Sequence, residues 1–137
     1  MLQKNYLLNK DEIVALGASL REIEPKLLKK CQQPGITRMW FQGEEPYLDV
    51  FFELKDEEIL WFQFTLRGKS VSWDYQKGQL QTGTTNELNC NDVSFYAASK
   101  TIENDIQPNL DLITSVKLIL QTRMEEPIFA KTLKLFN

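Results

Sequence analysis

Apolar and polar residues alternate through five consecutive segments between Thr37 and Thr84. This period-two pattern is cut by short sequences typical of turns, so it predicts five β-strands in simple up-and-down order. Within two of these segments, 47–54 and 59–67, the even-numbered positions form an apolar set: Leu48, Val50, Phe52, Leu54, Leu60, Phe62, Phe64 and Leu66. Successive side chains of a strand point to opposite faces, so the pattern predicts an antiparallel meander with one apolar face.

The turn sequences predict how these strands pair. We expect a three-residue loop at 56–58, and a type II′ turn at Gly68-Lys69 with glycine at its first central position. Lys77-Gly78 predicts the next turn. The pairs expected from these turns are Leu54 with Leu60, Leu66 with Val71, Phe64 with Trp73, Phe62 with Tyr75, and Leu80 beside Tyr75. The loop at 43–46 joins the first strand and places Met39 and Phe41 on the apolar face.

A helix is expected before the strands. Asn9 and Glu12 have the spacing of a capping box. Apolar residues then recur at three- and four-residue spacing: Ile13, Leu16, Leu20, Ile23 and Leu27. Pro25 cannot donate a hydrogen bond to a helix, so the helix should break near Glu24 and continue as a second short piece.

The chain becomes helical again near its end. Residues 86–106 fit either a helix capped by Asp92 or a further strand, and both alternatives stay open. A buried helix is expected after Pro108-Asn109, and the apolar tail after Pro127 should dock as a short helix or an edge strand. The sequence therefore predicts a single α+β domain over residues 1–137, with an N-terminal helix, a five-stranded antiparallel β-meander and C-terminal helices packed on the sheet.

Composition narrows the classes of function. The net charge is −3 and the basic residues are dispersed, which argues against nucleic-acid binding. Cys31 and Cys90 fit neither a disulfide framework nor a CxxC redox pair, and no signal peptide or membrane-spanning run is recognised. We therefore expect a cytoplasmic protein. The chain has no histidine, the commonest general base and metal ligand, so we expect no metal and no cofactor.

The polar face of the predicted sheet carries four aromatic side chains toward one end. The candidate ligand or partner surface comprises Arg38, Trp40, Tyr47, Asp49, Phe51, Trp61 and Arg67. Four uncovered aromatic side chains would exceed the apolar patch of about 300–600 Å² that a typical monomer exposes. Something is therefore expected to cover them, and the C-terminal helices, a second subunit and a ligand all stay open.

The same face carries three carboxylates, namely those of Asp49, Glu53 and Asp74. Two carboxylates can divide acid and base roles when their environments separate their pKa values. The structural alternative is that Asp49 bonds to Trp40 or Thr65, and that the other two are solvated or paired with arginine. Any mixed sheet face yields such a set, so catalysis is the less favoured hypothesis.

No motif of a known family is recognised. The leading hypothesis is a small non-enzymatic protein-interaction or regulatory module that forms a homodimer, or binds another protein, through the aromatic surface. The alternative is a small-molecule-binding domain with an aromatic pocket between the sheet and the C-terminal helices, anchored by Asp49 and Arg67. An enzyme that uses the sheet carboxylates comes third.

Overall fold

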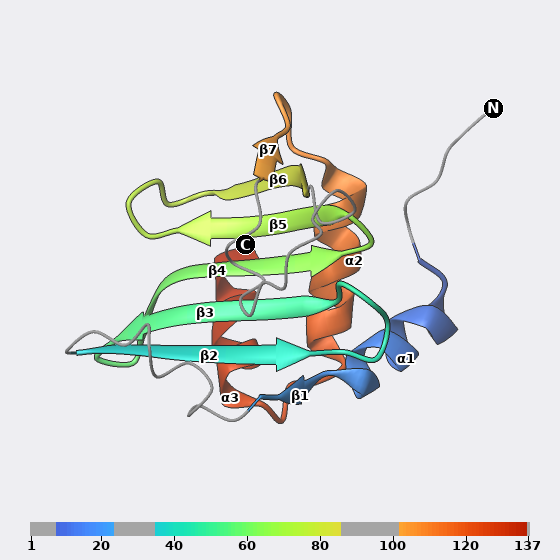
Figure 1. Cartoon of the computed structure of the whole chain (residues 1–137), viewed down its shortest axis with the longest axis horizontal. Coiled ribbons are helices and arrows are strands. Elements are labelled where there is room, and N and C mark those ends of the chain that lie inside the picture. The colour runs from blue at the N-terminus through green and yellow to red at the C-terminus, as the bar shows by residue number, and fades with distance from the viewer. Residues whose placement is uncertain (1–7, 24–34, 86–101, 137) are drawn as a thin grey trace.

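A computed structural model describes residues 8–23, 35–85 and 102–136 of the chain. Its strands pair as one seven-stranded antiparallel sheet, each with its sequence neighbour (Figure 1). The strands are β1 (Arg21–Glu22), β2 (Ile36–Gln42), β3 (Asp49–Lys55), β4 (Glu58–Leu66), β5 (Lys69–Asp74), β6 (Leu80–Thr85) and β7 (Ile102–Asn104). The helices are α1 (Lys10–Ser19), α2 (Leu110–Gln121) and α3 (Pro127–Leu133), followed by a 3₁₀ turn, η4 (Lys134–Phe136). The α+β class is confirmed, but the prediction of five strands is wrong because β1 and β7 extend the meander at its two edges.

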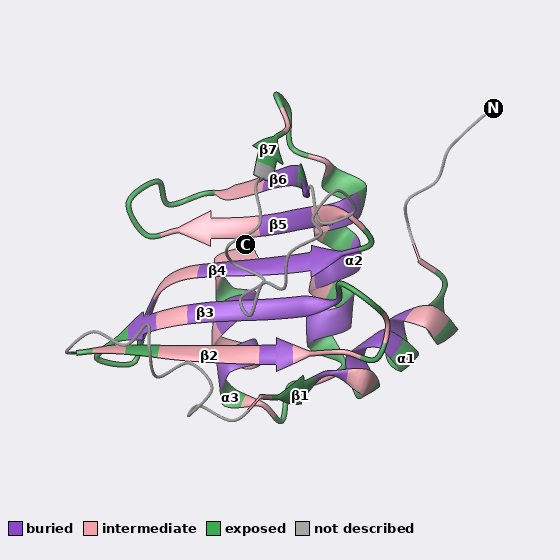
Figure 2. Ribbon diagram, in the orientation of Figure 1, coloured by how far each residue is buried: buried purple, intermediate pink, exposed green. Residues whose placement is uncertain are grey.

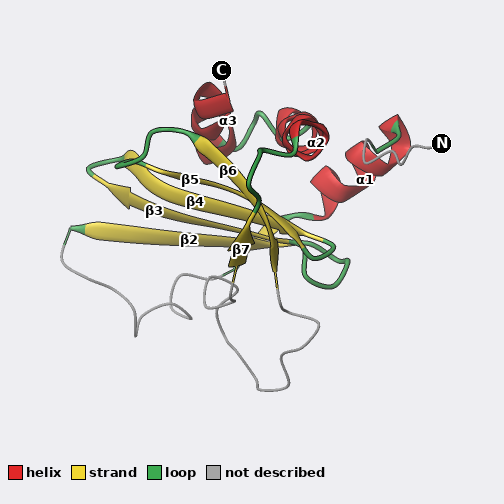
Figure 3. Ribbon diagram, turned by 90° about the horizontal axis from the view of Figure 1, so that it is seen from above, coloured by secondary structure: helices red, strands yellow, loops and turns green. Residues whose placement is uncertain are grey.

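The hydrophobic core lies between the sheet and the three helices. The helices share one face of the sheet (Figure 3), and the strand residues that face them are buried (Figure 2). Five phenylalanines have at most 1% of their surface exposed: Phe41, Phe52, Phe62, Phe64 and Phe129. The ring of Phe129 on α3 lies 4.7 Å from Phe41 and 6.1 Å from Phe52, centroid to centroid. Each such side chain contributes about 1.5–3 kcal/mol by leaving water. The predicted core positions of Phe41 and Met39 are confirmed.

The β3–β4 hairpin turns through two residues, where three were predicted. Asp56 and Glu57 have φ angles of 52° and 70°, and positive φ at both central residues is the signature of a type I′ turn. Leu54 consequently pairs with Ile59, and not with Leu60. A register irregularity just before Leu54 then restores the predicted facing along the rest of the hairpin.

The β4–β5 turn lies one residue earlier in the sequence than predicted. Arg67 and Gly68 have φ angles of 53° and 81°, so this turn is again type I′ and the predicted type II′ turn is wrong. Phe62 therefore pairs with Trp73, a register that differs from the prediction by two residues. A shift of two keeps every side chain on its expected face. Leu80 accordingly pairs with Trp73, and the predicted neighbour Tyr75 is exposed.

Helix α1 begins as predicted and ends earlier. The Asn9 side chain accepts a hydrogen bond from the Glu12 backbone at 2.8 Å, and the reciprocal bond completes the capping box. The helix stops at Ser19 because Leu20 is extended, which delivers β1 to the edge of the sheet. The expected break near Glu24 is thus wrong by several residues, since strand pairing overrides the helical pattern. The second helical piece (through 28) and the alternatives over 86–101 lie outside the described residues.

At the C-terminal end, Asn109 caps α2 by accepting a bond from the Leu112 backbone at 3.1 Å. The predicted start of this helix is therefore confirmed. The tail after Pro127 resolves as a helix, with Pro127 at its first position.

Arg123 connects the N-terminal helix α1 to the C-terminal helical segment. Its Nη1 atom donates to the backbone oxygens of Gly17 and Leu20 at 2.9 and 2.6 Å, at the C-terminal end of α1. Its Nη2 atom lies 3.4 Å from a carboxylate oxygen of Glu126, and the guanidinium carbon lies 5.9 Å from the centre of the Phe129 ring. The side chain is only 17% exposed, so these interactions are shielded from water.

Helices α1 and α2 approach each other closely beside this arginine. A Cβ atom built on Gly17 would lie 2.0 Å from Thr122 Oγ1. That hydroxyl in turn donates to the Ile119 backbone oxygen at 2.6 Å, so it is held in place. Glycine is therefore required by the packing of the two helices, despite its low helix propensity.

We expect Arg123→Met to lower the free energy of unfolding by about 2–4 kcal/mol, because it removes the shielded guanidinium that donates to the backbone oxygens of Gly17 and Leu20. Urea unfolding followed by circular dichroism would measure the loss. Glu125→Gln is the matched control. Glu125 pairs with Arg123 at 2.5 Å but is largely exposed, so its replacement should cost less than about 0.5 kcal/mol. Equal losses in the two variants would contradict the role of the buried contacts.

The carboxyl group of Glu22 should make the stability of the fold depend on pH. Partial burial, and secondly the charge of Glu126, raise the pKa of the Glu22 carboxyl. The folded state therefore holds this proton more tightly than the unfolded state, and ionisation of Glu22 destabilises the fold as pH rises. Glu22→Gln should raise the free energy of unfolding, measured by urea unfolding at neutral pH, by less than about 0.5 kcal/mol because water screens the site. The gain should vanish as pH falls through the range where glutamate titrates; a gain that persists there would count against this explanation.

Candidate functional site

The sheet has a second face, opposite the three helices, which we call the distal face. Residues on this face line up in cross-strand rows along the register of β2 to β6. The first row is Arg38, Glu53, Trp61 and Asp74; the second is Trp40, Phe51, Gln63, Ser72 and Gln81; the third is Gln42, Asp49, Thr65, Ser70 and Gly83. Adjacent members of a row lie about 5 Å apart, close enough for direct side-chain contact.

Three aromatic side chains pack together on the distal face, separately from the main core. This aromatic cluster comprises Trp40, Phe51 and Trp61. The rings of Trp40 and Phe51 stack at a centroid distance of 5.2 Å with 20° between their planes. Phe51 is only 4% exposed, whereas both tryptophans are half-buried. The cluster thus presents two tryptophan rings around a buried phenylalanine.

Asp49 holds one of these tryptophans in place. Its carboxylate is 5% exposed, and Oδ1 accepts a hydrogen bond from Trp40 Nε1 at 3.1 Å. The expected bond to Trp40 is therefore confirmed, while Thr65 donates instead to the Tyr47 backbone oxygen. The carboxylate serves as a buried acceptor that orients the indole.

Glu53 is likewise engaged. Arg38 contacts a single oxygen of its carboxylate, with both Nε and Nη2 lying 2.9 Å from Oε2. The expected pairing of a sheet carboxylate with Arg38 is confirmed. Neither Asp49 nor Glu53 is therefore a carboxylate with both oxygens free for proton transfer, which weakens the case for catalysis.

The structure brings together five of the seven predicted surface residues: Arg38, Trp40, Asp49, Phe51 and Trp61. Tyr47 precedes β3, in a loop with φ of 64°, and its side chain is 43% exposed. Arg67 lies in the β4–β5 turn, where Nε is 2.6 Å from the Glu45 carboxylate. The predicted pocket between the aromatic residues and the C-terminal helices is wrong, because α2 and α3 pack on the opposite face (Figure 3).

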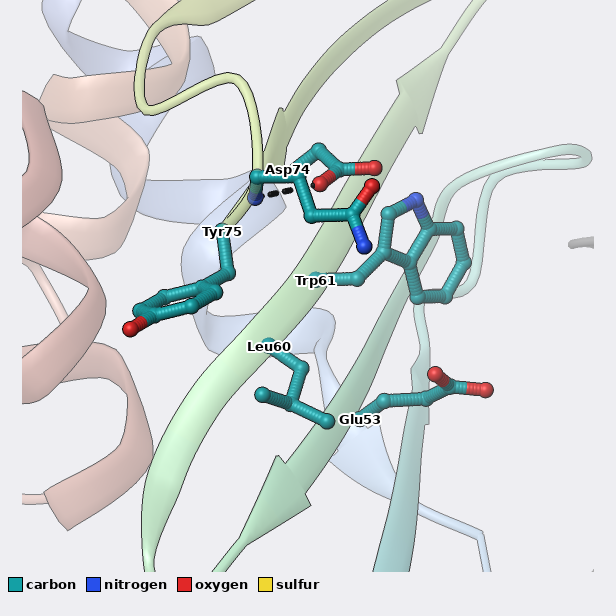
Figure 4. A pocket seen from close by; sticks show the side chains of 6 residues that line it. Glu53, Leu60, Trp61, Asp74 and Tyr75 are labelled. Atoms are coloured by element: carbon teal, nitrogen blue, oxygen red, sulfur yellow. Dashed lines mark hydrogen bonds between the residues drawn. The ribbon is translucent and has the colours of Figure 1, made fainter.

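A hollow of about 510 Å³ lies beside the aromatic cluster (Figure 4). Its lining residues are Glu53, Leu60, Trp61, Asp74, Tyr75 and Gln76. The sequence pattern did not predict this hollow, for two reasons. The predicted register placed Trp61 opposite Gln76 where the structure pairs it with Asp74, and Leu60 was expected in the core but is only half-buried. With the correct register, the cross-strand pairing of Trp61 with Asp74 would have indicated this hollow.

Asp74 is oriented by the loop that follows β5. Its Oδ1 atom accepts a hydrogen bond from the Gln76 backbone at 2.7 Å, and its backbone oxygen accepts one from Gly78 at the same distance. These two bonds fold the loop back beside the strand. The carboxylate is thereby fixed next to the Trp61 indole, as Figure 4 shows.

Trp40→Phe should lower the free energy of unfolding by about 1–3 kcal/mol, because it removes the indole donor that serves the buried Asp49 carboxylate. Trp61→Phe is the matched control, since the Trp61 indole makes no hydrogen bond within the described ranges, and its cost should be clearly smaller. Urea unfolding monitored by circular dichroism would compare the two. A Trp61→Phe loss as large as that of Trp40→Phe would show that ring size, and not the hydrogen bond, matters.

Over the ranges that the structure covers, no three acidic or cysteine side chains are placed to hold a metal ion, and no helix is long and apolar enough to cross a membrane. No protein-family model matches the chain, and comparison with curated proteins and with solved structures gave no match. Function must therefore be inferred from the side chains of the chain itself.

Proposed function

We propose that this chain is a non-enzymatic protein-interaction module that associates with a second copy of itself through the aromatic cluster. The observation that supports this proposal is the pair of half-buried tryptophans on the sheet face away from the helices. Tryptophan is enriched among the residues that dominate binding energy at protein interfaces, because a large ring buries much apolar area with few rotatable bonds.

The neighbouring residues favour a second copy as the partner. The second row, which contains Trp40 and Phe51, continues through glutamine and serine and carries no charged side chain. Two copies can therefore meet across this row, related by a two-fold axis, without burying like charges against each other. The paired charges of Arg38 and Glu53 would lie at the rim, where interfaces are typically polar.

An interaction role is preferred to catalysis because two of the sheet carboxylates already interact with neighbouring side chains. Asp49 is committed to Trp40, and Glu53 to Arg38. A general base must reach the proton that it abstracts, so Asp49, which is buried and bonded to Trp40, is a poor candidate; Glu53 is partly exposed, with one oxygen held by Arg38. The small-molecule alternative has support only from the hollow beside Trp61.

Light scattering on a sizing column at low-micromolar concentrations would test the proposal. We expect the wild-type chain to have twice the mass of a single copy, and Trp61→Asp to weaken association at least about tenfold by placing a charge in the interface. Ile106→Asp is the control, because Ile106 is fully exposed in the loop between β7 and α2 and should leave the mass unchanged.

Circular dichroism on both variants would verify that they fold. Folded Trp61→Asp that associates as strongly as wild type would exclude the aromatic cluster as the interface. A wild-type chain that stays monomeric throughout this concentration range would refute self-association.

A further inference from the structure

The hollow beside Trp61 combines an aromatic ring with two carboxylates. Glu53 and Asp74 are the cross-strand neighbours of Trp61 on its two sides, so the three side chains form a continuous part of the first row. Strands lie about 4.8 Å apart, which puts about 10 Å between the Cα atoms of the two acidic residues. The Trp61 indole lies between the Asp74 and Glu53 side chains, and all three line the hollow (Figure 4).

Each carboxylate has one oxygen engaged and one available. Arg38 contacts only Oε2 of Glu53, and the Gln76 backbone donates only to Oδ1 of Asp74. Within the described ranges, Oε1 of Glu53 and Oδ2 of Asp74 have no hydrogen-bond donor. The two free oxygens can therefore accept from a ligand without breaking the bonds that fix both side chains.

The charges around the hollow do not cancel. The single positive charge of Arg38 balances one of the two carboxylates, which leaves a net charge of −1 beside the Trp61 ring. A cation over the face of an indole is attracted by the ring quadrupole, and tryptophan is the strongest of the aromatic side chains in this respect. The hollow is thus suited to a ligand with one positive charge.

We propose that this hollow binds the guanidinium group of an arginine side chain from a partner protein. Guanidinium is flat, stacks on aromatic rings and directs five N–H donors in its own plane, so it can lie on Trp61 while it donates to a carboxylate oxygen at the edge of the ring. An ammonium group is a compact, strongly hydrated point charge and matches this arrangement less well. The inference rests on the proposed function only in assigning the distal face to contact with protein, and it does not require a second copy.

A titration of the isotope-labelled chain by NMR would test the site with small probes. The chain has three tryptophans, so three indole N–H signals report separately, and Trp61→Phe identifies the relevant one. At millimolar concentrations and low salt, N-acetyl-arginine amide should shift the Trp61 signal in a saturable way. N-acetyl-citrulline amide, a neutral analogue of nearly the same shape, should not shift it, and N-acetyl-lysine amide should bind more weakly.

Two variants make the result specific. Asp74→Asn keeps the acceptor for the Gln76 backbone and removes the charge, so it should raise the dissociation constant for the arginine probe about two- to fivefold. Asp111→Asn, an exposed carboxylate at the start of α2, is the matched control and should titrate as wild type does. Equal shifts from the arginine and citrulline probes, equally strong binding of the lysine probe, or an Asp74→Asn titration like that of wild type would overturn the inference.

The same samples separate this inference from the proposed function. A monomer whose Trp61 signal responds to the arginine probe would refute self-association and support the guanidinium site. A dimer with no such response would leave self-association standing and refute the guanidinium site, because the hollow would then not be open to a ligand in the assembled protein.

Discussion

The fold depends on how the chain provides hydrogen-bond donors for the backbone oxygens at the end of its first helix, α1. Helix α1 must stop at Ser19 so that β1 can join the sheet, and this leaves backbone carbonyls in a partly buried position. Arg123, more than a hundred residues later, donates to two of them and stacks near Phe129. One guanidinium thus ties the end of α1 to the start of α3.

Because all three helices occupy one face, the two faces of the sheet bury different sets of side chains. The helix face buries the phenylalanines that stabilise the domain, including Phe41 and Phe62. The distal face buries Phe51 against two tryptophans, in a cluster that the main core does not contact. Side chains of that size on a face not needed for the core are the physical basis for proposing that it contacts a partner.

The alternation of apolar residues was sufficient to predict the facing of Phe41 and Phe52, and the Asn9–Glu12 spacing predicted the helix start, because these depend on local sequence. The strand register was not predictable in the same way. Glycine at position 68 suits either of two turn types, and the choice between them moves every β4–β5 pair by two residues. The end of α1 depends on the pairing of β1 with β2, and the need for glycine at position 17 depends on Thr122; no local pattern connects either partner to α1.

The sequential order of the strands has a consequence for the route by which the chain folds. Each strand pairs only with its neighbours in the sequence, so the central sheet can form by adding one hairpin at a time, and each addition closes a short loop. The contact between Gly17 and Arg123 spans 106 residues, and its geometry exists only once α2 is in place. Helix α1 is therefore expected to dock late, onto a surface that the rest of the domain has already built.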